Sequence, residues 1–140
     1  MIDPQDLAPD TGWALASLRI ASDELSADAI SERLDLRASS TRAAEGEPAF
    51  TVWMYETGLG PSAAIDDHLY ILVERLRDRR DALAELCERA NVEIWLSYSP
   101  GVTGKRSAVF DHKVLAELGD LGIDLVLDPY PPGRRRAAGA

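Results

Sequence analysis

Two aspartate–histidine pairs, Asp67-His68 and Asp111-His112, are the residue combinations in this sequence best suited to metal-assisted catalysis. A metal site needs three or four converging ligands, and the two pairs together offer that number if the fold brings them together. One hypothesis is therefore a small metal-dependent hydrolase that uses these four residues. The simpler interpretation is that the aspartates lie at helix N-termini, where the helix dipole favours negative charge, and that the histidines are surface or half-buried residues.

The other chemistry-bearing residues do not form a recognisable catalytic motif. Cys87 is the single cysteine and lies on an apolar stripe, so we expect a buried, inert thiol that forms neither an intramolecular disulfide nor a zinc site. The acidic pairs Asp66 with Asp67 and Asp124 with Asp128 would need a pocket that raises one pKa, and the sequence shows none. The stretch "GVTGK" lacks the spacing of a phosphate-binding loop. We therefore expect no cofactor, and the sequence leans toward a protein without enzymatic activity.

The best functional lead is the tryptophan in "VEIWLSYS", residues 92–99. A half-buried strand alternates apolar residues toward the core with polar residues toward solvent, yet Trp95 falls on the polar side. In another predicted strand, residues 50–57, we also assign Trp53 and Tyr55 to the side away from the core. If helices cover only one face of the sheet, the other face would collect Ser17, Arg19, Thr51, Trp53, Tyr55, Glu93, Trp95, Ser97, Asp124 and Asp128.

Such an aromatic and polar face predicts binding, because aromatic rings supply contact area at low entropic cost and their polar edges form hydrogen bonds. A second interpretation is that the loop 37–49 or the N-terminal arm covers the face, so that the aromatic residues form a small satellite core with Arg19 as a cation–π lid. In a third interpretation the chain forms a homodimer through this face or through the long helix predicted over 62–90. The candidate binding residues are Arg19, Trp53, Tyr55, Glu93, Trp95 and Asp128.

The charge of the chain restricts its partners. The formal net charge of the 140 residues is −9 with Arg134, Arg135 and Arg136 counted, and therefore −12 without these three. A protein with this much negative charge repels phosphate backbones and anionic membranes. We therefore expect neither a nucleic acid nor a membrane as a partner. We favour a protein partner, such as a basic protein that this chain neutralises, or a small polar ligand of cationic or sugar-like character. No apolar run approaches the ~20 residues that span a bilayer, and no signal peptide is recognisable, so we expect a cytoplasmic protein.

These residues must be positioned by strands and helices. Strands are expected over 13–22, 50–57, 92–99 and 123–130, mostly from alternating apolar residues. Helices are expected over 26–35, 62–90 and 111–122, and the second carries one apolar stripe with a bend or boundary at "RDRRDA". Ser26, Ser62 and Asp111 are the predicted N-caps, and Gly122 ends the last helix. We expect a loop over 37–49 and a short edge strand over 105–110.

The strand–helix–strand plan of the first part of the chain recurs at its end, with the long helix between. Because the strands alternate, this plan predicts an α+β fold related to the ferredoxin-like folds, with a mixed sheet of four to five strands and helices on one face, including one long amphipathic helix. An α/β fold with helices on both faces is the alternative. The length favours a single domain over 13–131, with residues 1–12 as a disordered arm and 132–140 as a flexible basic tail.

Four stretches of the sequence resemble a known family. They are "SLRI" at Ser17–Ile20, "LSADAISERLDL" at Leu25–Leu36, "DDHLYILVERLRDRRDALAELCERANVEIWLSYS" at Asp66–Ser99 and "LGIDLVLDPY" at Leu121–Tyr130. Through them the chain resembles, over about Trp13 to Pro131, the bacterial family named domain of unknown function 4279. The resemblance implies a shared fold. The stretches are core and cap patterns, so the resemblance implies no activity.

Overall fold

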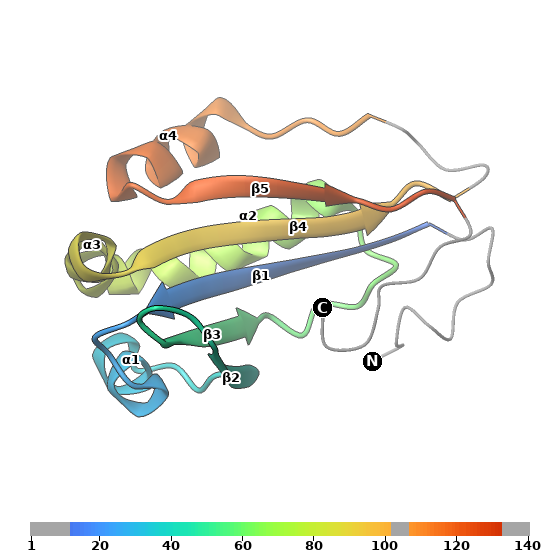
Figure 1. The fold of residues 1–140 in the computed structure, drawn as a ribbon. Coiled ribbons are helices and arrows are strands. Elements are labelled where there is room, and N and C mark those ends of the chain that lie inside the picture. Colours follow the sequence, from blue (N-terminus) through green and yellow to red (C-terminus); the bar gives the residue numbers. More distant parts are fainter. Residues whose placement is uncertain (1–11, 102–106, 133–140) are drawn as a thin grey trace.

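The structure is a computed structural model that describes residues 12–101 and 107–132. Five strands form one sheet in the order β2-β3-β1-β4-β5 (Figure 1). The strands are β1 (Trp13–Ser22), β2 (Ser40–Ala44), β3 (Phe50–Glu56), β4 (Asn91–Ser99) and β5 (Asp124–Pro129). The helices are α1 (Ala27–Leu34), α2 (Ile65–Leu76), α3 (Arg80–Arg89) and α4 (His112–Leu121), with a short 3-10 helix, η2 (Arg77–Arg79), between α2 and α3.

Two helices begin and end where the sequence predicts. The hydroxyl of Ser26 accepts a hydrogen bond from the backbone of Ala29 at the start of α1, and the Asp111 carboxylate accepts one from the backbone of Lys113 at the start of α4. Each bond satisfies a donor that the first helical turn leaves without an intrahelical partner. Gly122 ends α4 in the left-handed conformation, with φ at 75°. These three predictions are confirmed.

The long helix is also confirmed, with one correction at its start. The elements α2, η2 and α3 follow one another without interruption from Ile65 to Arg89, and the tighter 3-10 turn lies within the "RDRRDA" stretch where a bend was predicted. The N-cap of α2 is Ala64 rather than Ser62, and its side chain makes no capping hydrogen bond. Asp66 and Asp67 in the first turn interact favourably with the helix dipole instead.

The bend of the long helix also supports α1. The Nε of Arg79 donates to the carbonyl of Leu34 at 2.7 Å, and its Nη2 donates to the carbonyl of Asp35 at 3.2 Å. These carbonyls belong to the last turn of α1. No further helical N–H group is available there to donate a hydrogen bond to them. Arg79 therefore ties the C-terminal end of α1 to the middle of the long helix.

Strand β2 lies within the range 37–49, where the sequence predicts a loop, so that prediction is wrong for Ser40–Ala44. Its residues are exposed along nearly its whole length and show no apolar alternation. Strand β2 pairs antiparallel with β3, so the chain reverses between them, and β3 runs antiparallel to β1. By contrast, β5 follows α4 directly and runs parallel to β4. The two strand–helix–strand units that look alike in sequence therefore differ in strand direction.

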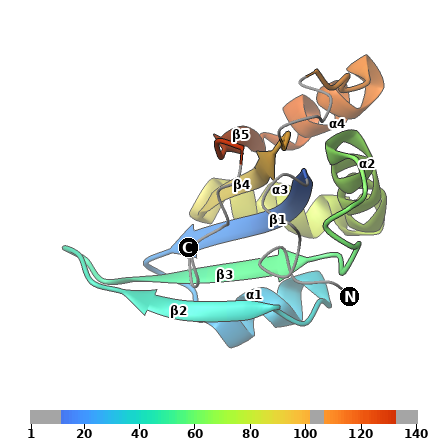
Figure 2. The same cartoon turned by 90° about the vertical axis from the view of Figure 1, so that its right-hand side faces the viewer.

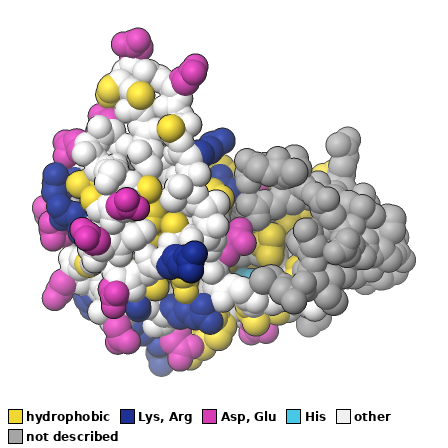
Figure 3. Space-filling model, turned by 90° about the horizontal axis from the view of Figure 1, so that it is seen from below, with side chains coloured by type: hydrophobic (Ala, Val, Ile, Leu, Met, Phe, Trp, Pro, Cys, Tyr) yellow, Lys and Arg dark blue, Asp and Glu magenta, His cyan; other side chains and the backbone are white. Residues whose placement is uncertain are grey.

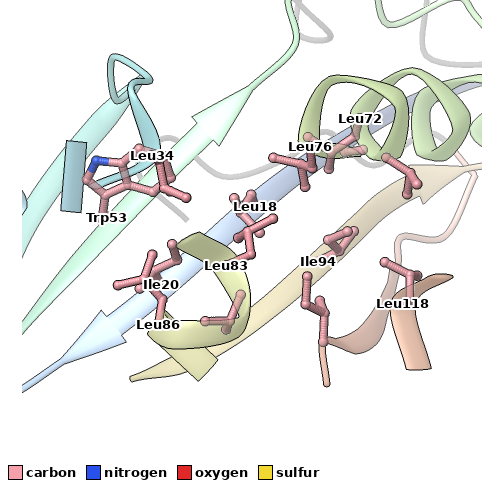
Figure 4. Packing of buried hydrophobic residues seen from close by; sticks show 14 of the residues in the cluster. Leu18, Ile20, Leu34, Trp53, Leu72, Leu76, Leu83, Leu86, Ile94 and Leu118 are labelled. Atoms are coloured by element: carbon pink, nitrogen blue, oxygen red, sulfur yellow. The ribbon is translucent and has the colours of Figure 1, made fainter. Parts of the chain in front are cut away.

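The helices pack on one face of the sheet, as predicted. Leu18 and Ile20 of β1 and Ile94 of β4 are fully buried beneath them (Figures 2 and 4). The leucines of the long helix fill the space between the two layers. This arrangement confirms an α+β fold with a mixed sheet and helices on one face. The helical residues of the core include Ile30, Leu34, Leu69, Leu72, Leu76, Leu83, Leu86, Val114 and Leu118.

Other sequence-based expectations fall at the margins of the described chain. The predicted edge strand over 105–110 is wrong for residues 107–110, which form neither strand nor helix, while residues 105 and 106 lie outside the described part. The predicted arm and basic tail likewise lie almost wholly in residues 1–11 and 133–140, outside the description. Seen from the side of β2 and α1, the described surface shows acidic and basic side chains interspersed, with only small hydrophobic patches between them (Figure 3).

Candidate functional site

Trp53 lies on the helix-covered face of the sheet, opposite to the side expected. It pairs with the buried Ile20 across β1 and β3, is fully buried, and donates from its Nε1 to the hydroxyl of Ser31 in α1 at 2.9 Å. The error has a simple origin. Strand β3 is apolar on both sides, and Val52 and Met54 resemble a core pair as closely as the aromatic residues do. Trp53 is therefore a core residue, and its indole N–H joins the sheet to α1.

Tyr55 lies on the same covered face, at the margin of the core. It pairs with Leu18 across the two strands, and its ring stacks on that of Trp53 with centroids 6.3 Å apart. Its hydroxyl accepts a hydrogen bond from Arg75, which also donates to the carbonyl of Thr57. The prediction that Trp53 and Tyr55 share a face with Trp95 is therefore wrong, and both are removed from the candidate site.

The other face of the sheet is covered by no helix among residues 12–101 and 107–132, and we call it the open face (Figure 2). Side chains alternate between the two faces of a strand, so the strand pairings identify which residues share it. Trp95 does lie on this face, as predicted, on strand β4 near the middle of the sheet. The central residues of the open face are Ser17 and Arg19 of β1, Glu56 of β3, Glu93, Trp95 and Ser97 of β4, and Asp124, Val126 and Asp128 of β5.

A cation–π contact stands at the centre of the open face. The guanidinium carbon of Arg19 lies 4.1 Å from the centroid of the Trp95 ring. Arg19 is directly opposite Glu93 across the strands, and Trp95 is opposite Ser17, so the arginine reaches the ring along the diagonal between neighbouring pairs. The indole N–H of Trp95 points to the Glu93 carboxylate at 3.4 Å. The predicted arginine lid is confirmed for Trp95.

Carboxylates border this contact on the β5 side. Glu93 is paired directly with Asp124, and Ser97 donates from its hydroxyl to the carboxylate of Asp128 at 3.1 Å. Like charges directly opposite one another on a sheet repel, which makes the neighbourhood of Glu93 and Asp124 favourable for a cation. Glu93 also pairs with Arg19 of β1 on its other side, so Arg19 is the basic residue that lies across β4 from Asp124. The open face thus combines an aromatic centre with an acidic side.

Two aromatic residues of the open face were not selected from the sequence. Trp13 of β1 and Tyr130, which follows β5, contact one another with ring centroids 5.2 Å apart. Trp13 is opposite Ser99, at the end of the sheet where β1 begins. The alternation of the strand does indicate Trp13, because side chains on one face of a strand recur at every second residue and Trp13 is an even number of residues before Arg19. Trp13 is buried, so its ring packs within this end of the face.

The two aspartate–histidine pairs do not form one site. His68 is buried, with one ring nitrogen hydrogen-bonded to the backbone of Gly60, whereas the side chain of His112 is 89% exposed. Burial lowers the pKa of His68, against the smaller opposing effects of the Gly60 hydrogen bond and of nearby carboxylates. Asp111 caps α4 through its backbone contact and lies 3.7 Å from the ring of His112. The position of both aspartates at helix N-termini and the exposed His112 match the simpler interpretation of these pairs, but the expectation of a surface or half-buried histidine is wrong for His68, which is fully buried.

The aspartates of both pairs, together with the neighbouring Asp66, line one hollow of about 180 Å³ between α2 and α4. Asp66, Asp67 and Asp111 form its acidic lining, and Tyr70 and Phe110 are among its apolar residues. Neither histidine lines it. Within the described residues, no group of three or more histidine, cysteine, aspartate or glutamate side chains is arranged to hold a metal ion.

Cys87 is half-buried on α3 and packs against the core. Burial raises the pKa of its thiol, and the negative charge of Asp124 adds to this effect. A raised pKa keeps the side chain in the unreactive thiol form. This agrees with the expectation of an inert thiol, although the side chain is less deeply buried than expected.

The fold and the open face define a small α+β domain with one sheet, helices on one side and an aromatic, acidic surface on the other. The chain belongs to the family described as Domain of unknown function (DUF4279), whose model matches residues 11–132. Comparisons with curated proteins and with solved structures found no significant match. Among the described residues, no helix is both long enough and apolar enough to cross a membrane.

Proposed function

We propose that this chain is a non-enzymatic binding domain whose open face engages a basic segment of a protein partner. The observation that carries the proposal is the Arg19–Trp95 contact, with the carboxylates of Glu93, Asp124 and Asp128 beside it. An aromatic ring and several acidic groups on one surface provide both contact area and charge for arginine or lysine side chains. The formal net charge of −9 would also accelerate the approach of a basic partner.

The geometry of the face suits an extended segment. Its acidic residues Glu93, Asp124 and Asp128 lie on neighbouring parallel strands, and the side chains of an extended peptide project to one side at every second residue. A peptide lying across β4 and β5 can therefore bring alternate basic side chains to successive carboxylates. The Trp95 ring lies between the Glu93 and Ser97 positions, where the stem of a lysine or arginine can pack on it.

A nuclear magnetic resonance titration tests this proposal. The probe is a short peptide that alternates arginine and glycine, and its counterpart alternates glutamate and glycine. The reporter is the indole N–H resonance of Trp95, identified with Trp95→Phe. We expect the basic peptide to shift this resonance and the acidic peptide to leave it unchanged. No shift with the basic peptide would overturn the proposal, and light scattering that showed a dimer with a protected Trp95 would reassign the open face to a subunit interface.

Charge-matched variants separate binding at the face from attraction to the acidic body. The variant Glu93→Gln/Asp124→Asn/Asp128→Asn should bind the basic peptide about tenfold more weakly, because three carboxylates near the peptide are lost. The control Glu74→Gln/Glu88→Gln/Asp120→Asn loses the same charge from exposed helical positions and should retain most of the affinity. Equal losses in both variants would show that the peptide senses only the net charge.

A further inference from the structure

The described chain ends against the open face. The backbone N–H of Tyr130 donates to the carbonyl of Tyr98 at 2.7 Å, and the Tyr130 ring lies on Trp13. The hydroxyl of Ser99 donates to the carbonyl of Pro131 at 3.3 Å. Trp13 and Ser99 are paired residues of the open face, so residues 130 and 131 are fixed at one end of it. The chain therefore continues into residues 133–140 from the border of this face.

The sequence that follows has the charge opposite to that of the acidic side of the face. Residues 133–140 read GRRRAAGA, with Arg134, Arg135 and Arg136 in succession and no acidic residue. The open face carries Glu93, Asp124 and Asp128 on the strands nearest to this point of departure. The arginine-rich segment and the acidic side of the face are therefore complementary in charge.

The segment is long enough to return along the face. An extended chain spans at most about 3.4 Å per residue, so eight residues reach about 27 Å. Strand β5 has six residues, which span about 20 Å at the strand rise. The arginines are the second to fourth residues of the segment, so the Cα of Arg136 lies at most about 14 Å from that of Pro132. Asp128, near the end of β5, is therefore the carboxylate closest to their reach. A short connection to Pro131 also keeps the segment at a high effective concentration, on the order of millimolar.

We propose that residues 133–140 bind back onto the open face of the same chain and compete there with the basic segment of a partner. This inference rests on the proposed function, because it assigns an internal competitor to the same surface. Only partners whose affinity exceeds that of the tethered arginines then occupy the face fully. The internal segment reduces the apparent affinity of every basic partner to the intrinsic affinity multiplied by the fraction of chains in which the face is free.

The test compares the full chain with Arg134→Ala/Arg135→Ala/Arg136→Ala, and Arg134→Lys/Arg135→Lys/Arg136→Lys serves as the charge-preserving control. In low salt, the Trp95 indole resonance of the alanine variant should differ from that of the unaltered chain, while the lysine variant stays close to the latter. The difference should shrink at about 1 M salt, where the Debye length falls to about 3 Å. Identical resonances in all three proteins at low salt would overturn the inference.

Titration with the arginine–glycine peptide distinguishes failure of the inference from failure of the proposed function. We expect the alanine variant to bind the peptide about threefold more tightly than the full chain, because its face is free of the internal competitor. Equal, measurable affinities would leave the open face as a binding surface and overturn only the internal competition. Absence of binding to the alanine variant would overturn the proposed function itself.

Discussion

Arg19 and Trp95 form a cation–π pair across two adjacent strands, with the guanidinium carbon 4.1 Å from the ring centroid on the open face of the sheet. We predict a coupling of about 0.5–1 kcal/mol between them, which is typical of half-exposed pairs. The measurement is a double-mutant cycle with Arg19→Met and Trp95→Leu, using urea denaturation. The cycle cancels the other contacts of each residue, so additive effects of the two substitutions would show that the pair contributes nothing to stability.

Trp53 should be far more important for stability than Trp95, although both were placed on one face by sequence reasoning. Trp53→Leu removes much of a fully buried ring and should cost about 3 kcal/mol or more, whereas Trp95→Leu should cost about 1 kcal/mol. Ser31→Ala leaves the Trp53 indole N–H without its 2.9 Å acceptor and should cost about 1 kcal/mol. Urea denaturation of the three variants tests the ranking, and equal costs for the two tryptophans would contradict it.

The contrast between these tryptophans shows how far sequence patterns could determine the site. In β4, the polar residues Glu93 and Ser97 mark the side away from the helices, so the alternation predicts the face of Trp95 correctly, although Ser97 itself is buried. In β3 both alternating sets are apolar, and only the pairing of Trp53 with Ile20 decides which set faces the helices. Pairing depends on contacts between distant parts of the chain, which a single strand does not encode.

The same distinction separates the helices from the edge strand. Local signals such as the Ser26 and Asp111 caps and the leucine stripe of the long helix were sufficient to predict these helices. Strand β2 carries no such signal, because its residues are exposed and it forms by pairing with β3. The direction of β3, and with it the strand order, depends on that unpredicted strand.

Asp111 should act as a helix cap and not as a metal ligand. Its carboxylate accepts from the backbone N–H of Lys113 at 2.7 Å. Asp111→Ala should therefore destabilise the protein by about 1 kcal/mol, while Asp111→Asn, which preserves the acceptor oxygen, should cost only a few tenths. Thermal denaturation with and without added zinc measures both effects. A zinc-dependent rise in melting temperature that disappears in Asp111→Asn would contradict the capping role.

His68 should make the stability of the protein depend on pH below neutrality. Its ring is buried, and its Nε2 has no hydrogen-bond partner within the described chain. Burial lowers its pKa in the folded state below the unfolded value of 6.5, even though Asp67, Glu56 and the Gly60 hydrogen bond act in the opposite direction. The unfolded state therefore binds a proton more readily, so the stabilisation is complete well above pH 6.5 and is lost as the pH falls from 6.5 toward the folded pKa.

Urea denaturation between pH 5 and pH 8 measures this effect against two variants. In the unaltered chain the free energy of unfolding should fall by up to about 1.4 kcal/mol per pH unit below the unfolded pKa, relative to His68→Asn, which has no titrating ring. His112→Asn is the matched control, because it removes the other histidine, whose side chain is 89% exposed. It should retain the full pH dependence. If His68→Asn kept the same slope as the unaltered chain, the acid sensitivity would arise from other groups.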